Sequence, residues 1–187
     1  MSKIRIRLDK RIFIILISLA LIISLIIFYN FYSPKPIKSW RIGDFLFVFR
    51  ADLREANKIP VYPSEDAVYL KLINPIVKNV TIAFKDAGQE NYYYSLETYE
   101  IVYKLSLFYK IKGMEVKFDS MEVDSYENLP GKFQNPIIAL VHPKFANETA
   151  IRIEDHVIYI QGKTAEEFDL AIVKFLMSAM GIELEQA

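Results

Sequence analysis

One stretch of the chain constrains everything around it: residues 12–32 contain no charged side chain. An α-helix rises about 1.5 Å per residue, so this run reaches about 30 Å, the thickness of the hydrocarbon core of a bilayer. The run is longer than the apolar part of a cleavable signal peptide, which is about 7–15 residues, and no small-x-small cleavage site comes after it. The sequence therefore predicts a retained single-pass transmembrane helix, a signal-anchor, over residues 12–32.

The flanking charges predict an orientation for this helix. Residues 1–11 form a basic tail, and Lys35, Lys38 and Arg41 follow the run less densely. Basic residues are enriched on the cytoplasmic side of membrane segments. We therefore expect a cytoplasmic tail over residues 1–11, and a domain that lies outside the cell membrane.

Two N-x-[ST] sequons agree with an external domain. They begin at Asn79 and Asn147, which are candidate glycosylation sites. Asn79 also adjoins an expected strand, so a simple turn residue is an equally good interpretation there.

Length and composition limit the part of the chain beyond the membrane segment. The chain has 187 residues, and we assign residues 33–44 to a tether and residues 45–187 to one domain. The absence of cysteine excludes disulfides, thiolate zinc sites and cysteine nucleophiles. The 23 basic and 23 acidic residues balance, so no net field attracts nucleic acid.

The hydrophobic pattern of the domain predicts an α/β fold. Residues 80–84 and 137–141 are short apolar runs typical of strands buried on both faces. A helical stripe over residues 95–112 separates the first of these from a strand at 114–118, which makes a parallel β-α-β unit. The other expected elements are strands at 45–49 and 67–73, a helical turn after residue 50, a hairpin over 150–160 turning near Glu154 and Asp155, and a helix over 164–180. Together these elements predict a largely parallel sheet with an added β-hairpin.

The tripeptide Gly162-Lys163-Thr164 resembles the end of a phosphate-binding loop. Such a loop needs a further glycine at position 157, which is valine, and residues 157–161 have the pattern of a strand. Thr164 and Glu167 instead have the spacing of a helix capping box, and Gly181 is a natural helix end. We therefore predict a helix start, and no nucleotide.

Three polar residues follow the two buried strands. Lys85 and Asp86 come after residues 80–84, and His142 comes after residues 137–141. Ligands of open parallel sheets bind at the carboxyl ends of strands, so these residues are candidates for a small-ligand site. With Glu90 nearby, the group would suit acid–base work or a divalent metal. The simpler alternative is that His142 caps the sheet edge and Asp86 starts a turn. No catalytic motif, metal site or cofactor is assigned.

The chain also carries many tyrosines between residues 92 and 109. The run 92–94, together with Tyr99, Tyr103 and Tyr109, either belongs to the core or forms an aromatic binding platform.

The last third of the domain has a recognisable series of motifs. A buried strand at 137–141 leads to a hairpin ending in I-x-G-x-T at 160–164, and then to E-E-x-D-L-A-x-x-K-F at 166–175. Residues 137–182 resemble α/β modules of archaeal surface-layer and related cell-envelope proteins. The resemblance implies an extracytoplasmic, non-catalytic role. Because this chain is short and carries an anchor, an accessory role is expected rather than lattice formation.

These observations predict a membrane-anchored, extracytoplasmic protein-interaction or cell-envelope accessory protein. Its partners would be the lipid bilayer, through residues 12–32, and a protein of the envelope. The alternative is an extracytoplasmic small-ligand-binding module with a crevice near Asp86 and His142. An interaction protein should expose a contiguous apolar patch, whereas a binding module should show a pocket with convergent polar groups.

Overall fold

The computed structural model describes residues 18–19, 21–24 and 35–184. The chain divides into two compact units, Met1–Lys35 and Pro36–Ala187. In the first unit, residues 18–19 and 21–24 are helical, and the rest of the expected membrane segment lies outside the described residues. Within the part of the chain that the structure describes, no helix is both long and apolar enough to cross a membrane. The transmembrane helix over residues 12–32 therefore stays a prediction.

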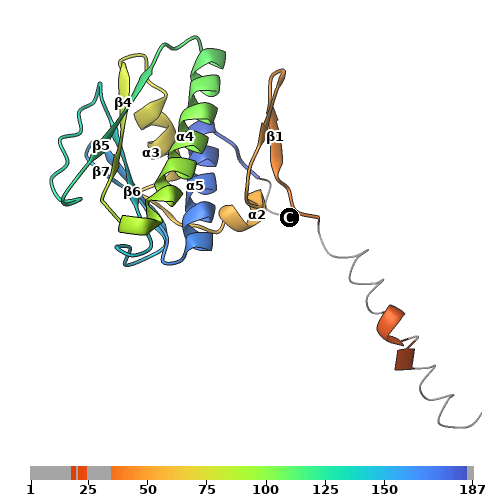
Figure 1. Ribbon diagram of the computed structural model, residues 1–187. Helices are drawn as coiled ribbons and strands as arrows, with labels where there is room; N and C mark the ends of the chain where they lie inside the picture. Colours follow the sequence, from red (N-terminus) through yellow and green to blue (C-terminus); the bar gives the residue numbers. More distant parts are fainter. Residues whose placement is uncertain (1–17, 20, 25–34, 185–187) are drawn as a thin grey trace, which may run out of the picture. The chain divides into compact units, whose positions relative to one another are not determined.

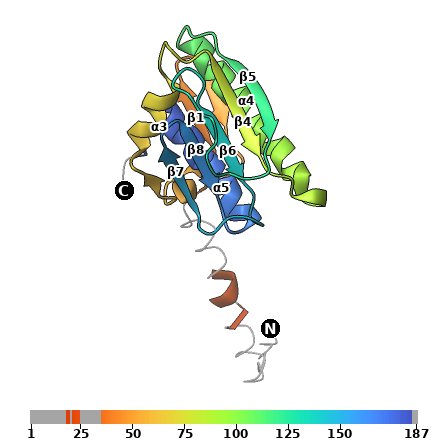
Figure 2. The same ribbon diagram turned by 90° about the vertical axis from the view of Figure 1, so that its left-hand side faces the viewer.

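The second unit is built on a six-stranded sheet, shown in Figures 1 and 2, with the order β3-β7-β8-β6-β4-β5. Strands β5, β4, β6 and β8 are mutually parallel, β7 is antiparallel to β8, and β3 pairs with β7. This confirms a largely parallel sheet with an added hairpin. The strands are β3 (Val61–Tyr62), β4 (Asn79–Phe84), β5 (Lys117–Glu122), β6 (Ile137–Val141), β7 (Ala150–Glu154) and β8 (Val157–Gln161).

Three helices cover one face of this sheet: α3 (Glu65–Leu72), α4 (Tyr92–Ile111) and α5 (Ala165–Met180) (Figure 1). A 3-10 turn, η1 (Gly88–Asn91), leads into α4. Helix α5 contacts both α3 and α4, and it also packs on β8. Because it is enclosed on several sides, its buried surface includes the polar side chains Lys174 and Ser178 as well as apolar ones.

The opposite face of the sheet is covered by a loop rather than by helices. The small side chains Ala83 and Ala139 leave room there, and residues 123–129 fold over them. The covering side chains are Val123, Tyr126 and Leu129. The centre of the sheet is thus buried on both sides, as the apolar runs at 80–84 and 137–141 predicted.

The start of α5 confirms the helix-start interpretation of Gly162-Lys163-Thr164. Residues 157–161 form β8, so they cannot curl around a phosphate. The Thr164 hydroxyl accepts a hydrogen bond from the Glu167 backbone N–H at 3.1 Å. The Glu167 carboxylate reaches one residue further than in a standard capping box, to the Lys163 N–H. Gly181 ends the helix in the left-handed conformation, with φ of 66°.

One expected strand, over residues 67–73, is wrong: residues 67–72 belong to α3, and Ile73 is the C-cap of that helix. Ser64 caps this helix by accepting from the Ala67 N–H. Val68 and Leu72, one turn apart, face the core, whereas Leu70 is 64% exposed. The Ser-Glu-Asp sequence at 64–66 is typical of a helix start. The prediction of a strand gave more weight to the apolar residues that follow it.

The first elements of the second unit form a separate hairpin, β1 (Ser39–Ile42) with β2 (Phe45–Val48). The strand expected at 45–49 exists, but it lies outside the main sheet, and β1 falls where a tether was expected. Phe47 points into the core, while Leu46 and Val48 are 56% and 61% exposed. A short helix, α2 (Leu53–Ala56), follows as the pattern after residue 50 predicted.

Candidate functional site

Strands β4 and β6 are neighbours, with Phe84 opposite Leu140. Lys85 and Asp86 therefore leave the sheet at the same edge as His142. The structure thus brings the three candidate ligand-binding residues to one edge, where parallel sheets bind ligands. Their side chains, however, have three different environments.

His142 is 2% exposed and lies among aromatic rings, those of Tyr93, Tyr94 and Phe145. Its Nδ1 accepts a hydrogen bond from the Lys144 N–H, and its Nε2 is 3.7 Å from a carboxylate oxygen of Glu90. Burial lowers the pKa of His142, although Glu90 acts in the opposite direction. The imidazole thus caps the sheet edge, and its buried Nε2 has no hydrogen-bond partner among the described residues.

Asp86 organises the turn into α4. One carboxylate oxygen accepts from the Gly88 N–H at 2.8 Å and from the Asn91 side-chain amide at 2.6 Å. These hydrogen bonds lower the pKa of Asp86, because they stabilise the carboxylate. Asp86 therefore has the turn-forming role that was the simpler alternative.

Lys85 alone of the three lines a cavity, of about 620 Å³, on the loop-covered face of the sheet. Its ammonium lies 5.1 Å from the centre of the Phe145 ring. Arg152, across the cavity, pairs with Glu148, which also accepts from the Gln161 amide. The charged and amide groups of Arg152 and Gln161 are thus both engaged by Glu148.

Tyr126 is a cavity residue that sequence reasoning missed. Its hydroxyl accepts from the Lys85 N–H, donates to the Leu140 carbonyl and lies 3.3 Å from the Tyr94 hydroxyl. It comes from a loop with no periodic pattern, so nothing in the sequence indicated that it would cross to this edge.

The two sequons differ in accessibility. Asn147 is exposed at the rim of the cavity. The Asn79 amide nitrogen donates to Asp119 at 2.7 Å, across β4 and β5. Glycosylation remains a prediction for both, and the geometry favours Asn147.

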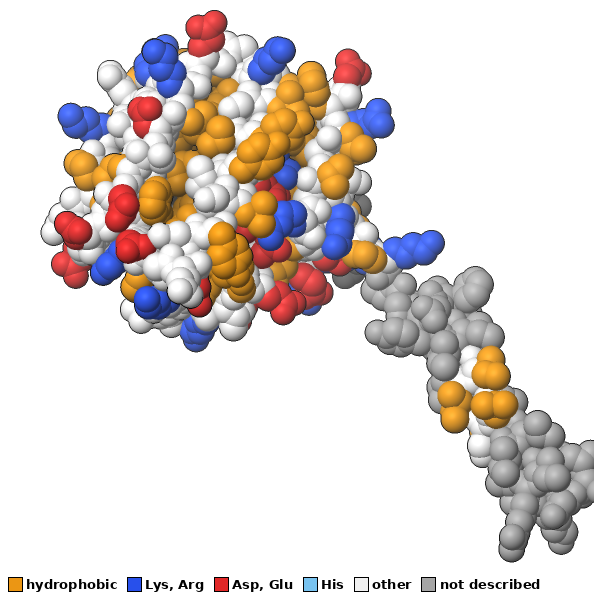
Figure 3. All heavy atoms as spheres, in the orientation of Figure 1, with side chains coloured by type: hydrophobic (Ala, Val, Ile, Leu, Met, Phe, Trp, Pro, Cys, Tyr) orange, Lys and Arg blue, Asp and Glu red, His pale blue; other side chains and the backbone are white. Residues whose placement is uncertain are grey.

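A second candidate surface is the exposed side of α4, seen in the space-filling view of Figure 3. Tyr99 and Tyr103 are 67% and 57% exposed, and their rings stack with centres 5.9 Å apart. A shallow groove of about 660 Å³ runs along this side of the helix. We define the α4 outer face by ten residues: Tyr92, Ser95, Leu96, Thr98, Tyr99, Val102, Tyr103, Ser106, Leu107 and Lys110.

The tyrosines of α4 divide between core and surface. Tyr94 and Tyr109 are buried, and burial raises the pKa of each. Tyr92, Tyr99 and Tyr103 lie on the outer face. Three of the six tyrosines that were candidates for an aromatic platform are therefore exposed together on one face of α4.

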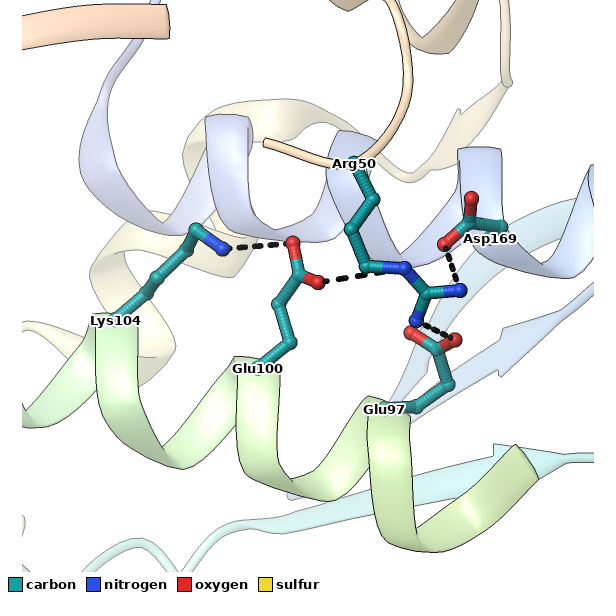
Figure 4. Close-up of polar contacts among 5 residues, drawn as sticks. All are labelled: Arg50, Glu97, Glu100, Lys104 and Asp169. Atoms are coloured by element: carbon teal, nitrogen blue, oxygen red, sulfur yellow. Dashed lines mark hydrogen bonds and ion pairs between the residues drawn. The ribbon is translucent and has the colours of Figure 1, made fainter. Parts of the chain in front are cut away.

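A charge cluster, in which Glu97, Glu100 and Lys104 are buried, joins α4, α5 and the residue after Phe49 (Figure 4). Arg50 contacts Glu97 at 2.8 Å, Asp169 at 3.4 Å and Glu100 at 3.9 Å. Glu100 also pairs with Lys104, one turn further along α4, at 2.7 Å, and both side chains are buried.

Burial and neighbouring carboxylates affect this cluster strongly. Desolvation raises the pKa of Glu97 to about 7, against the opposing effect of Arg50. Burial also raises the pKa of Asp169. The Lys104 ammonium lies 5.2 Å from the centre of the Phe49 ring, so the cluster holds the end of the β1–β2 hairpin against the helices.

Comparison of this chain with protein-family models, curated proteins and solved structures found no match. Any function must therefore be inferred from the geometry. Within the described residues, no three His, Asp or Glu side chains are grouped so as to hold a metal ion. Two candidates remain: the 620 Å³ cavity and the α4 outer face.

Proposed function

We propose that this protein is a membrane-anchored interaction domain that binds a protein partner through the α4 outer face. The exposed tyrosine stack on α4 is the observation that carries this proposal. The anchor is residues 12–32, and the domain lies outside the membrane as an accessory component of the cell envelope.

The composition of the α4 outer face supports a protein partner. From Tyr92 to Lys110 the face has no acidic side chain, and Lys110 is its only charge. Interface centres are depleted in charge and enriched in tyrosine. Tyr99 and Tyr103 already stack on each other, so a partner that covers them gains apolar contact while ordering little additional side-chain freedom.

The alternative is a small-ligand module at the carboxyl edge of the sheet. The 620 Å³ cavity beside Lys85 favours it. We rank it second because Arg152, Glu148 and Gln161 already bind one another, as do Tyr126 and its neighbours. A ligand that bound Arg152, Gln161 or Tyr126 would have to replace these internal bonds before it gained its own.

A double variant tests the proposal. Tyr99→Ser with Tyr103→Ser removes the aromatic stack from exposed positions, so the domain should keep its thermal stability. Complexes extracted from membranes into polymer-bounded discs should become smaller in sedimentation velocity, because the partner is lost. Leu70→Ser, at an equally exposed position on α3, is the matched control and should leave the complex unchanged. Identical complexes for the double variant and the wild type would reject the face as an interface.

A further inference from the structure

We propose that the partner on the α4 outer face is a second copy of this chain, packed with its α4 antiparallel across a two-fold axis. This inference rests on the proposed function and specifies it further. The axis would pass the helix at the level of residue 101. The order of side chains along the face supports this arrangement.

The single charge on the face selects the antiparallel arrangement. In a parallel pair, the two Lys110 ammonium groups would meet. In an antiparallel pair centred at residue 101, Lys110 of one copy instead meets Tyr92 of the other. That places an ammonium on an exposed aromatic ring, which is an attractive contact.

Most of the remaining face, apart from Thr98 and Val102, is self-complementary about the same centre. A two-fold axis at residue 101 keeps each side chain on its own edge of the face and exchanges the two ends of the helix. At about 100° per residue, Leu96 and Leu107 share one edge, and Ser95 and Ser106 share the other. Across the axis, therefore, leucine meets leucine, serine meets serine, and Tyr99 meets Tyr103. The serine edge lets the two helices approach closely.

The size of the face predicts when the dimer forms. Stable interfaces use about 20–30 residues on each side, and the face supplies ten. Association should therefore be weak for a freely diffusing domain. Chains held in one membrane have a much higher effective concentration, so the anchor would increase the fraction of chains that form the dimer.

Disulfide crosslinking tests the arrangement directly, because the chain has no cysteine of its own. The full-length chain is placed in lipid vesicles with one introduced cysteine and then oxidised. Val102→Cys lies beside the axis and should form a covalent dimer. Lys110→Cys lies about 27 Å along the helix from its symmetry mate and should stay monomeric. Mixing Lys110→Cys with Tyr92→Cys should restore a dimer.

The outcomes distinguish a failure of the dimer from a failure of the proposed function on which it rests. Crosslinking of both Val102→Cys and Lys110→Cys would overturn the antiparallel arrangement. If neither Val102→Cys nor the mixture crosslinks, yet the sedimenting complex still depends on Tyr99 and Tyr103, the partner is a different protein and only the self-association fails. If the double tyrosine variant leaves the complex unchanged as well, the proposed function fails with it.

Discussion

At the scale of single residues, Glu97 has the most strongly shifted pKa among the carboxylic acids of the described residues. It is 1% exposed, and its second carboxylate oxygen has no hydrogen-bond partner among the described residues. Its other carboxylate oxygen accepts a hydrogen bond from Arg50, which lies just after the β1–β2 hairpin. This contact links the hairpin to α4. Ionisation of Glu97 therefore has a direct effect on how firmly this hairpin is held.

The raised pKa of Glu97 predicts a pH-dependent stability. The folded state favours the protonated acid, so this contribution is fully present below about pH 4.5 and is lost as pH rises through 7. The free energy of unfolding should fall by about 3 kcal/mol over that range. Glu97→Gln should remove most of this fall, leaving the smaller dependence from Asp169, which has the same sign.

Urea unfolding of residues 36–187 at several pH values measures this effect, since these residues form a compact unit with their own core. Glu115→Gln, at an exposed position, is the control and should keep the wild-type profile. A Glu97→Gln profile as steep as that of the wild type would show that Glu97 ionises normally in the folded chain.

The three candidate ligand-binding residues show how much of this site could be predicted from the sequence. Lys85, Asp86 and His142 were placed at one edge correctly, because residues that follow neighbouring parallel strands must meet there. Their accessibility could not be predicted, because it depends on Tyr93, Tyr94 and Phe145 closing around His142. Contacts between distant segments leave no local periodicity.

At the scale of elements, strong local signals predicted well. The helix at 164–180, the hairpin at 150–160 and the buried strands at 80–84 and 137–141 all exist. The failure at 67–73 arose because an eight-residue amphipathic helix and a strand can share one apolar run. Lys174 shows another limit: its burial results from α5 lying between two helices, with Asn57 and Glu65 binding its ammonium.

The start of α5 gives a prediction at this scale. A Cβ at Gly162 would lie 2.3 Å from the Phe168 backbone nitrogen, and no rotamer change can relieve a clash with backbone. Gly162→Ala should therefore lower the free energy of unfolding by about 3 kcal/mol in urea unfolding. Gly88→Ala, where the space is open but φ is 73°, should cost only about 1 kcal/mol. Equal costs would mean that Gly162 serves only backbone flexibility.

At the scale of the whole molecule, the chain combines an uncharged N-terminal run with a domain that keeps one helix face bare. The domain has enough core to fold without the exposed tyrosines of that face, since α4 is anchored by Ile101, Leu105 and Phe108. The exposed tyrosines are therefore available for binding rather than needed for stability. If residues 12–32 anchor the chain as proposed, this free aromatic face would suit an interaction confined to the membrane.

Labelling of introduced cysteines in intact cells with a membrane-impermeant maleimide is the most direct test of the proposed membrane-confined interaction. The natural chain contains no competing thiol. We compare Tyr103→Cys on the α4 outer face with Leu70→Cys on α3, both at well-exposed positions. We predict that Leu70→Cys is labelled at once, whereas Tyr103→Cys is protected until detergent disperses the complex. Equal labelling of both in intact cells would show that the face is bare, and labelling of neither before lysis would place the domain inside.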